Sequence, residues 1–179
     1  SIFDLVKRID LRAANKKAFE NLALAGGFDS FSPTHRSQYF NPDGEGITFL
    51  EKVMRFGSKY QESKNSSQTN LFGSQSDEVY QELKIPYCDP WENLEKLKRE
   101  KEVVGIYISG HPLDDYKKEM DFFTTNRLSV LKDLRLLVNK KLFFGGIINS
   151  IDHLESKNNK GWGKFVLEDF KDQYEFKIF

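Results

Sequence analysis

Residues 15–31 read NKKAFENLALAGGFDSF, and this stretch decides the fold of the first part of the chain. Asn15 is a residue type favoured just before a helix, because its side-chain oxygen accepts a hydrogen bond from an unpaired backbone N–H. Apolar residues follow at helical spacing, and Gly26-Gly27 is typical of a helix end. The stretch therefore predicts a helix that closes in a glycine hairpin, with a second helix resuming over Arg36–Phe40.

The predicted hairpin offers a way to bind DNA. Two short helices joined by glycines would turn backbone N–H groups and a helix N-terminus outward, and such groups bind phosphate without reading base sequence. Nearby cations would add positive charge. The DNA-binding residues expected here are Lys16, Lys17, Gly26, Gly27 and Arg36. An ordinary helical hairpin with a solvated basic face explains the same pattern, and the local sequence leaves both alternatives open.

Further helical sequence follows on both sides of the hairpin. Ile2–Leu11 and Ile47–Tyr60 space their apolar residues at helical intervals, and Asn41–Gly44 has the composition of a turn. Residues 58–80 are then rich in Ser, Asn, Gln and Lys. A segment of this composition cannot bury a core of its own, which predicts a mobile linker.

One short motif stands out in the predicted linker, Gln68-Thr69-Asn70-Leu71-Phe72. Leu71 and Phe72 would fill an apolar pocket on a partner protein, and the amide of Gln68 would hydrogen-bond in a smaller one. Burial of each apolar side chain would contribute ~1.5–3 kcal/mol before the cost of ordering the segment. The alternative is a linker that touches its own domain.

Helical sequence returns after the linker. Asp89-Pro90-Trp91-Glu92 has the residue types of a helix start, and the expected helix reaches Val103-Val104. Ser109–Pro112 interrupts the pattern, and Leu113–Phe123 is expected to form a separate helix. We expect His111 to hydrogen-bond within this turn rather than to transfer a proton, because no partner residue is placed for it.

The last part of the chain changes to strand periodicity. Leu142–Ile151 predicts a strand with a bulge or bend at Gly145-Gly146. Asn158–Gly161 predicts a hairpin turn, and the alternating residues at 165–167 and 174–178 predict two more strands.

Basic and aromatic residues around the predicted hairpin turn suit single-stranded DNA, which they would bind through phosphate charge and base stacking. These residues are Lys157, Lys160, Trp162 and Lys164. The alternative assigns Trp162 and Phe165 to the core of the β-structure. We favour the core for Phe165, and for Trp162 both alternatives stay open.

Composition limits the classes of function. The chain has 179 residues, with Lys plus Arg and Asp plus Glu at 27 each, so its formal net charge is +0. Any contact with nucleic acid must therefore come from local patches. The single cysteine, Cys88, excludes an internal disulfide and fits a reducing cytoplasm. No apolar run could span a bilayer and no secretory signal is evident, so we expect no membrane partner.

The sequence predicts no catalytic residue and no metal ligand in this chain. It has no Gly-rich phosphate loop, and its three histidines lack partners at metal-ligand spacing. It shows no compact acidic cluster of the kind that holds two metal ions. Asp114-Asp115 is the nearest candidate, and acids at the start of a helix simply suit its dipole. We therefore expect no cofactor here.

Taken in order, these motifs resemble the alpha subunit of bacterial DNA polymerase III over nearly the whole chain. The residues that carry the resemblance are Asn15-Lys16-Lys17, Gly26–Asp29, Gln68–Phe72, Pro90-Trp91, Glu100-Lys101-Glu102, Ser109-Gly110-His111-Pro112-Leu113 and Leu167-Glu168-Asp169.

The resemblance implies an α+β multi-domain fragment of four parts. These are a helical, helix-hairpin-helix region at 1–57, a flexible linker with a clamp-binding motif at 58–80, a helical connecting region at 81–138, and the N-terminal part of an OB-fold barrel at 139–179. The ends of the chain, Ser1 and Phe179, also lead us to expect an excised piece.

The resemblance also implies the partners. Residues 15–40 would hold duplex DNA, Gln68, Leu71 and Phe72 would dock on the sliding clamp, and the OB region would bind single strands. The parent protein would be a DNA-directed DNA polymerase that uses Mg²⁺ and works with other replicase subunits in the bacterial cytoplasm. The catalytic residues would lie outside this fragment.

Other functions predict different observations. A general repair or recombination module with the same hairpin and barrel is disfavoured by the Ser109–Leu113 block. An enzyme that itself cleaves or joins DNA would need a metal site. A segment that only spaces the polymerase from its tail would not bind the clamp.

Overall fold

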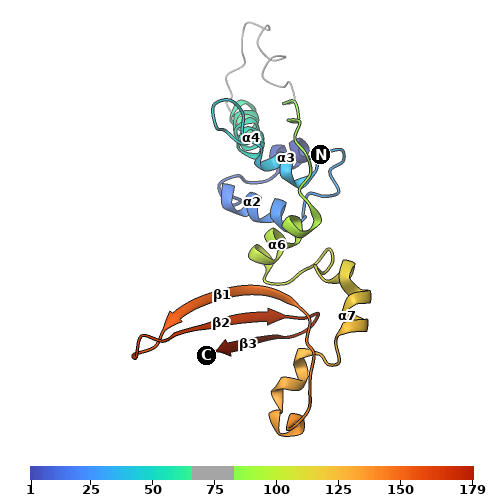
Figure 1. Cartoon of the computed structure of the whole chain (residues 1–179). Coiled ribbons are helices and arrows are strands. Elements are labelled where there is room, and N and C mark those ends of the chain that lie inside the picture. Colours follow the sequence, from blue (N-terminus) through green and yellow to red (C-terminus); the bar gives the residue numbers. More distant parts are fainter. Residues whose placement is uncertain (66–82) are drawn as a thin grey trace, which may run out of the picture. The chain divides into compact units, whose positions relative to one another are not determined.

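The computed structural model describes residues 1–65 and 83–179 (Figure 1). The chain divides into two compact units, Ser1–Ile108 and Ser109–Phe179. The first unit is helical, and the second contains a three-stranded antiparallel sheet. The expected α+β composition, with helices first and strands last, is thereby confirmed.

The first unit is built from α1 (Ile2–Arg8), α2 (Lys16–Leu24), α3 (Arg36–Phe40), α4 (Phe49–Asn65) and α6 (Asn93–Val104). Aromatic rings dominate its core: Phe3 lies edge-on to both Phe49 and Phe56, with ring centroids 6.1 and 5.7 Å apart. The buried core residues are Ile2, Phe3, Val6, Phe19, Ala23, Phe28, Tyr39, Phe49, Leu50, Val53 and Phe56. Helix α4 begins two residues later than expected and continues to Asn65, into the stretch whose composition predicted a linker.

Helices α1 and α4 pack closely because Gly57 has no side chain. A Cβ on Gly57 would lie 2.7 Å from Val6 Cβ and 2.8 Å from the Val6 carbonyl oxygen. Gln61, one turn further along α4, donates to the carbonyl oxygens of Val6 and Ile9 at 2.8 and 2.7 Å. These contacts fix the end of α1 and the chain that leaves it.

Helix α6 begins at Asn93 with Glu92 as its N-cap, so the expected start at Asp89 and Pro90 is wrong. The residues before it are held to α3 instead. Ser37 Oγ donates to the carbonyl oxygen of Asp89 at 2.9 Å, and Gln38 Nε2 donates to that of Pro86 at 2.8 Å. Trp91 stacks on Phe40 with centroids 5.5 Å apart. These tertiary contacts override the local helix-start signal.

The second unit contains short helical segments followed by the sheet. Its elements are η1 (Asp114–Tyr116), α7 (Lys117–Phe123), η2 (Leu128–Lys132), η3 (Leu134–Leu137), β1 (Ile147–Glu155), β2 (Gly161–Glu168) and β3 (Gln173–Ile178). The strand order is β1-β2-β3. Phe165 pairs with Ile151 on one side and Phe176 on the other, which places the three residues on the same face.

Strand β1 starts at Ile147, five residues later than predicted, after two glycines that lie against other backbone and side chains. A Cβ on Gly145 would meet Met120 Sδ at 2.6 Å, and one on Gly146 would meet the Glu168 carbonyl oxygen at 2.3 Å. The bulge expected at these glycines lies elsewhere, because both precede β1 and the irregularity in its pairing with β2 falls between Ile148 and Ser150. The glycines instead allow other chain segments to approach closely. The positions predicted for the other two strands are confirmed.

Among the described residues, none of the helices has the length and apolar character needed to cross a membrane.

Candidate nucleic-acid interface

The hairpin between α2 and α3 begins as predicted. Asn15 Oδ1 accepts the backbone N–H of Ala18 at 3.0 Å and caps α2. At the other end, Gly26 adopts a left-handed conformation with φ of 85°. Its N–H donates to the Ala23 carbonyl oxygen at 3.2 Å, and the N–H of Gly27 donates to that of Leu22 at 2.8 Å. This pair of bonds is a Schellman motif.

The glycine amides are therefore used inside the protein. They satisfy the last carbonyls of α2, whereas the sequence led us to expect that they point outward to a phosphate. Gly26 and Gly27 shape the hairpin, and any phosphate contact must come from other groups around it.

Arg36 is also placed differently from its expected role, because its side chain is only 6% exposed. Its Nε and Nη2 donate to the two carboxylate oxygens of Asp29 at 2.9 and 2.7 Å, and Nη1 donates to the Leu24 carbonyl oxygen at 3.0 Å. The hydrogen bond to Asp29 is the main reason that the pKa of Arg36 is raised above its ordinary value. The guanidinium thus joins the end of α2 to the start of α3.

Glu100 completes this buried cluster from α6. Its side chain is fully buried, Oε1 lies 3.5 Å from Arg36 Nη2, and Oε2 accepts the N–H of Ile108 at 3.2 Å. The sequence analysis missed this role because Glu100 stands in a strongly charged helix. Its one local signal is the spacing from Leu97: residues three apart share a helix face, and Leu97 is buried.

The two lysines at the start of α2 differ in how they are held. Lys16 pairs with Glu51 of α4 and lies 3.7 Å from Glu20. The hydrogen bond to Glu51 is the largest of the effects that raise the pKa of Lys16. The side chain of Lys17 is 73% exposed, and its ammonium only reaches Glu20 at 4.0 Å. Of the two, Lys17 is the cation more available to a ligand.

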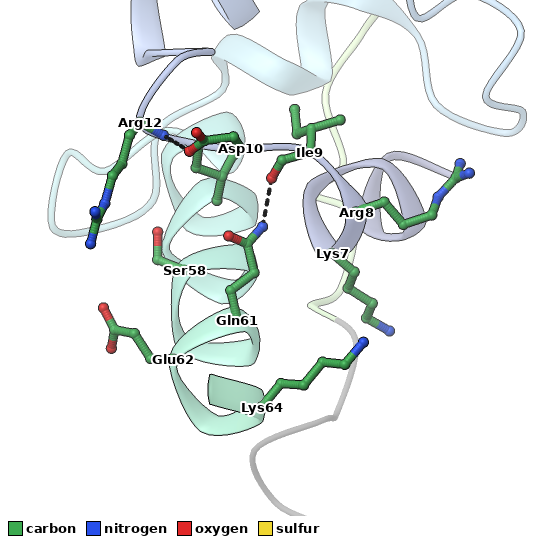
Figure 2. Close-up of a pocket in the computed structure, with 10 residues that line it drawn as sticks. Lys7, Arg8, Ile9, Asp10, Arg12, Ser58, Gln61, Glu62 and Lys64 are labelled. Carbon is green, nitrogen blue, oxygen red and sulfur yellow. Dashed lines mark hydrogen bonds between the residues drawn. The ribbon is translucent and has the colours of Figure 1, made fainter. Parts of the chain in front are cut away.

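A second basic region, which the sequence analysis did not identify, lies where α1 and α4 meet (Figure 2). It is a pocket of about 560 Å³. Its lining residues are Lys7, Arg8, Ile9, Asp10, Leu11, Arg12, Ser58, Gln61, Glu62 and Lys64. Lys7, Arg8 and Arg12 are neighbours in sequence and gave the only local signal. Lys64 joins them because α4 packs against α1.

In the sheet, Lys164 and Trp162 lie two residues apart on β2 and so project from the same face. Lys164 lies 3.2 Å from a carboxylate oxygen of Glu175 and 3.4 Å from one of Asp152. The hydrogen bond to Glu175 is the main reason that its pKa is raised. Trp162 stacks on Phe179, with centroids 5.7 Å apart and planes inclined by 16°.

The two remaining predicted cations lie in the turn between β1 and β2. Lys157 and Lys160 are both exposed, and the turn is closed by the Ser156 N–H, which donates to the Lys160 carbonyl oxygen at 2.9 Å. Phe165 stacks on Phe176 on the opposite face from Lys164, with centroids 5.2 Å apart. The structure thus gathers Lys157 and Lys160 in one turn, and Lys164 and Trp162 on one strand face.

His111 hydrogen-bonds within the turn at Ser109–Leu113, as predicted. Its imidazole Nδ1 accepts the backbone N–H of Leu113 at 3.1 Å, and the backbone N–H of His111 donates to Asp114 Oδ2 at 2.7 Å. The imidazole also packs on Phe170, with the two ring centroids 4.9 Å apart.

The residues predicted to bind the clamp, Gln68, Leu71 and Phe72, lie outside the described residues. Within residues 1–65 and 83–179, no three His, Cys, Asp or Glu side chains are grouped to hold a metal.

Comparison with known proteins gives one matching family model and several similar proteins. Residues 1–39 match a family model described as a helix-hairpin-helix motif. The chain is 32% identical over 182 residues to DNA polymerase III subunit alpha of Borreliella burgdorferi, which covers 100% of the chain. Subunits of the same name from Vibrio cholerae and Campylobacter jejuni are 27% and 29% identical, each over 99% of the chain. The chain spans 14–15% of the length of these relatives.

Proposed function

This chain is homologous along its whole length to one segment of the bacterial DNA polymerase III alpha subunits, and from this premise we propose that it binds DNA and the sliding clamp within a replicative polymerase. The observation that carries the DNA-binding part is the helix-hairpin-helix match at residues 1–39, which includes α2, its Schellman turn and the start of α3. The segment would support processive, template-directed synthesis by holding the polymerase to its template.

For the complete protein we propose DNA-directed DNA polymerase activity with Mg²⁺ as the metal of the reaction. A polymerase binds two metal ions through carboxylates held close together. We assign none of these ligands to this chain, so its own contribution is binding.

The first unit would bind the backbone of duplex DNA. Lys17 is the exposed cation beside the hairpin, and Lys16 could exchange a carboxylate partner for a phosphate. Such contacts position a protein on DNA and carry no sequence preference, which suits a polymerase that must copy any template. Arg36 and Glu100 would act indirectly, by holding α2, α3 and α6 in place.

The second unit would bind single-stranded DNA. We propose that β1, β2 and β3 are the first three strands of an OB-fold barrel. Lys157 and Lys160 would meet phosphates, and Trp162, with Lys164 beside it on the same strand face, would stack on a base.

The sliding clamp would dock on Gln68, Leu71 and Phe72. The proposal rests on the sequence pattern of this motif and on the relatives, which are named as alpha subunits of DNA polymerase III. Other replicase subunits and a location in the bacterial cytoplasm belong to the same proposal.

The DNA-binding part is tested with fluorescently labelled DNA. Fluorescence anisotropy of a labelled duplex and of a labelled single strand is measured as the chain is added, at a series of salt concentrations. We expect both DNAs to bind, more weakly as salt rises, because bound phosphates release counterions. Saturable duplex binding that does not respond to salt, or no duplex binding at low salt, would contradict the proposed backbone contact.

A further inference from the structure

The pocket between α1 and α4 gathers more positive than negative charge in a protein with no net charge. Four cations line it, from the end of α1, the following loop and the last turns of α4. Two carboxylates, Asp10 and Glu62, line it as well. Four positive charges less two negative charges leave the lining at +2. In Figure 2, Lys7 and Lys64 extend toward one another at one end of the pocket, and Arg12 lies at the other.

These cations form few ion pairs with carboxylates. Within the described part of the chain, no ion pair involves Lys7, Arg12 or Lys64. The ammonium of Lys7 instead lies 5.2 Å from the ring centroids of Phe56 and Tyr60, which leaves its charge unneutralised. Arg8 pairs with Asp4 at 2.7 Å, but that pair is well exposed. Exposed pairs of this kind contribute little and exchange readily.

The framework of the pocket is held by hydrogen bonds that use none of its cationic side chains. Gln61 fixes the carbonyl oxygens of Val6 and Ile9, and the Asp10 carboxylate accepts the backbone N–H of Arg12 at 2.9 Å. Asp10 therefore shapes the loop as well as opposing the cations. A loop fixed in this way presents Arg12 without a large ordering cost when a ligand binds.

We propose that this pocket is a second phosphate-binding site, which takes the sugar–phosphate backbone of duplex DNA. The inference rests on the proposed DNA-binding function and extends it to residues outside the α2–α3 hairpin. None of the described residues that line the pocket has an aromatic ring on which a base could stack, so we assign the contact to the backbone. Lys7, Arg8 and Arg12 also fall within the helix-hairpin-helix match. A contact here would add a second point of attachment to the same duplex.

The test compares four versions of the whole chain in anisotropy titrations of a labelled duplex at several salt concentrations. The wild type is measured beside the pocket variant Arg12→Ala/Lys64→Ala. The matched control is Arg55→Ala/Lys59→Ala, which removes the same two residue types from exposed positions of α4 that do not line the pocket. The fourth version, Arg12→Lys/Lys64→Arg, keeps both charges.

We expect the pocket variant to bind the duplex about tenfold more weakly and to lower the slope of log K against log salt by about 2, one for each lost phosphate contact. The control should change both quantities much less, and the charge-keeping variant should bind like the wild type. If the pocket variant and the control lose equal amounts of duplex affinity, the proposed site is wrong. The wild type would still bind the duplex in that case, so the proposed function would stand. No duplex binding by the wild type would overturn both.

Inorganic phosphate is the other source of the same chemistry. In a separate arm, phosphate is added while the NMR signals of residues 9–12 are followed, and duplex is then added. We expect the duplex to shift these signals and to displace phosphate. Saturation by phosphate without displacement by the duplex would assign the pocket to a free anion and overturn the proposal.

Discussion

Gly26 leaves the space that the guanidinium of Arg36 occupies. A Cβ at Gly26 would lie 2.1 Å from Arg36 Nη2 and 3.0 Å from Asp29 Oδ2. Gly26 also has a φ of 85°, a conformation that side chains disfavour. One residue therefore closes helix α2 and makes room for the ion pair that joins α2 to α3.

Replacing Gly26 with Ala is expected to destabilise the first unit by more than the cost of the backbone conformation alone. That cost is about 1–2 kcal/mol, and displacement of the buried guanidinium adds to it. Gly105→Ala is a matched control, because Gly105 has a similar φ of 87° but open space around it. Urea unfolding followed by far-UV circular dichroism checks the difference, and equal losses in the two variants would contradict the described contact.

Removing the Arg36 side chain should lower the stability of the first unit, because a buried carboxylate loses a neighbouring positive charge. Arg36→Met removes the guanidinium that lies 3.5 Å from the fully buried Glu100, and breaking a buried pair costs about 3–5 kcal/mol. Adding Glu100→Gln should recover part of that loss, so the two changes are expected to be non-additive. Unfolding of the single and double variants measures the coupling, with Arg55→Met on the exposed face of α4 as control. Strict additivity would argue against the pair.

The beginning and end of α2 could be predicted because their determinants are local. Asn15 caps the helix and Gly26 ends it through hydrogen bonds within a few residues of each. The start of α6 could not be predicted from local sequence, because side chains of α3 hold the preceding residues through long-range hydrogen bonds.

In the candidate sites too, features set by nearby residues could be predicted, whereas features set by tertiary contacts could not. That Lys157 and Lys160 share a turn could be read from their spacing, and the structure agrees. The burial of Arg36 could not be predicted, because its partner Glu100 lies on α6, far away in the sequence. Lys64 reaches the α1–α4 pocket only through the packing of two helices that are distant in sequence. Sequence alone located cations but not the carboxylates that neutralise some of them.

Asp169 should make the stability of the second unit depend on acid pH. Its carboxylate is 2% exposed and accepts the N–H groups of Leu128, Lys171 and Asp172 at 2.7, 2.9 and 2.9 Å. Burial opposes its charge, but these hydrogen bonds outweigh burial and lower its pKa below the ordinary value of 3.8. A lowered pKa stabilises the fold above the unfolded value, and this contribution is lost as the pH falls through the folded value.

Asp169→Asn is therefore expected to destabilise the second unit by about 1–3 kcal/mol at neutral pH. The asparagine side chain keeps one oxygen, so at least one of the three buried N–H groups loses its acceptor. The gap between variant and wild type should narrow as the pH falls below about 4. Asp152→Asn, at a 53% exposed carboxylate, is the surface control. Thermal unfolding at pH 7 and pH 3 checks both variants, and a gap that widens in acid would refute this role.

Gly57→Ala tests the close approach of α1 and α4. Alanine favours a helix over glycine by about 1 kcal/mol, but the added Cβ would meet Val6 at 2.7 Å, and overpacking typically costs about 1–3 kcal/mol. We expect net destabilisation, together with weaker duplex binding if the α1–α4 pocket is distorted. Gly44→Ala, where a Cβ would meet nothing within 4 Å, should be tolerated. Denaturant unfolding distinguishes the two, and a stabilised Gly57→Ala protein would contradict the packing.

The most direct test of the proposed replicase role is calorimetric titration of a matched bacterial sliding clamp into this chain and into Leu71→Ala/Phe72→Ala. The account predicts micromolar binding, about −8 kcal/mol, that disappears in the double variant. Binding that survives the two substitutions, or no binding by the wild type, would contradict docking through Gln68, Leu71 and Phe72.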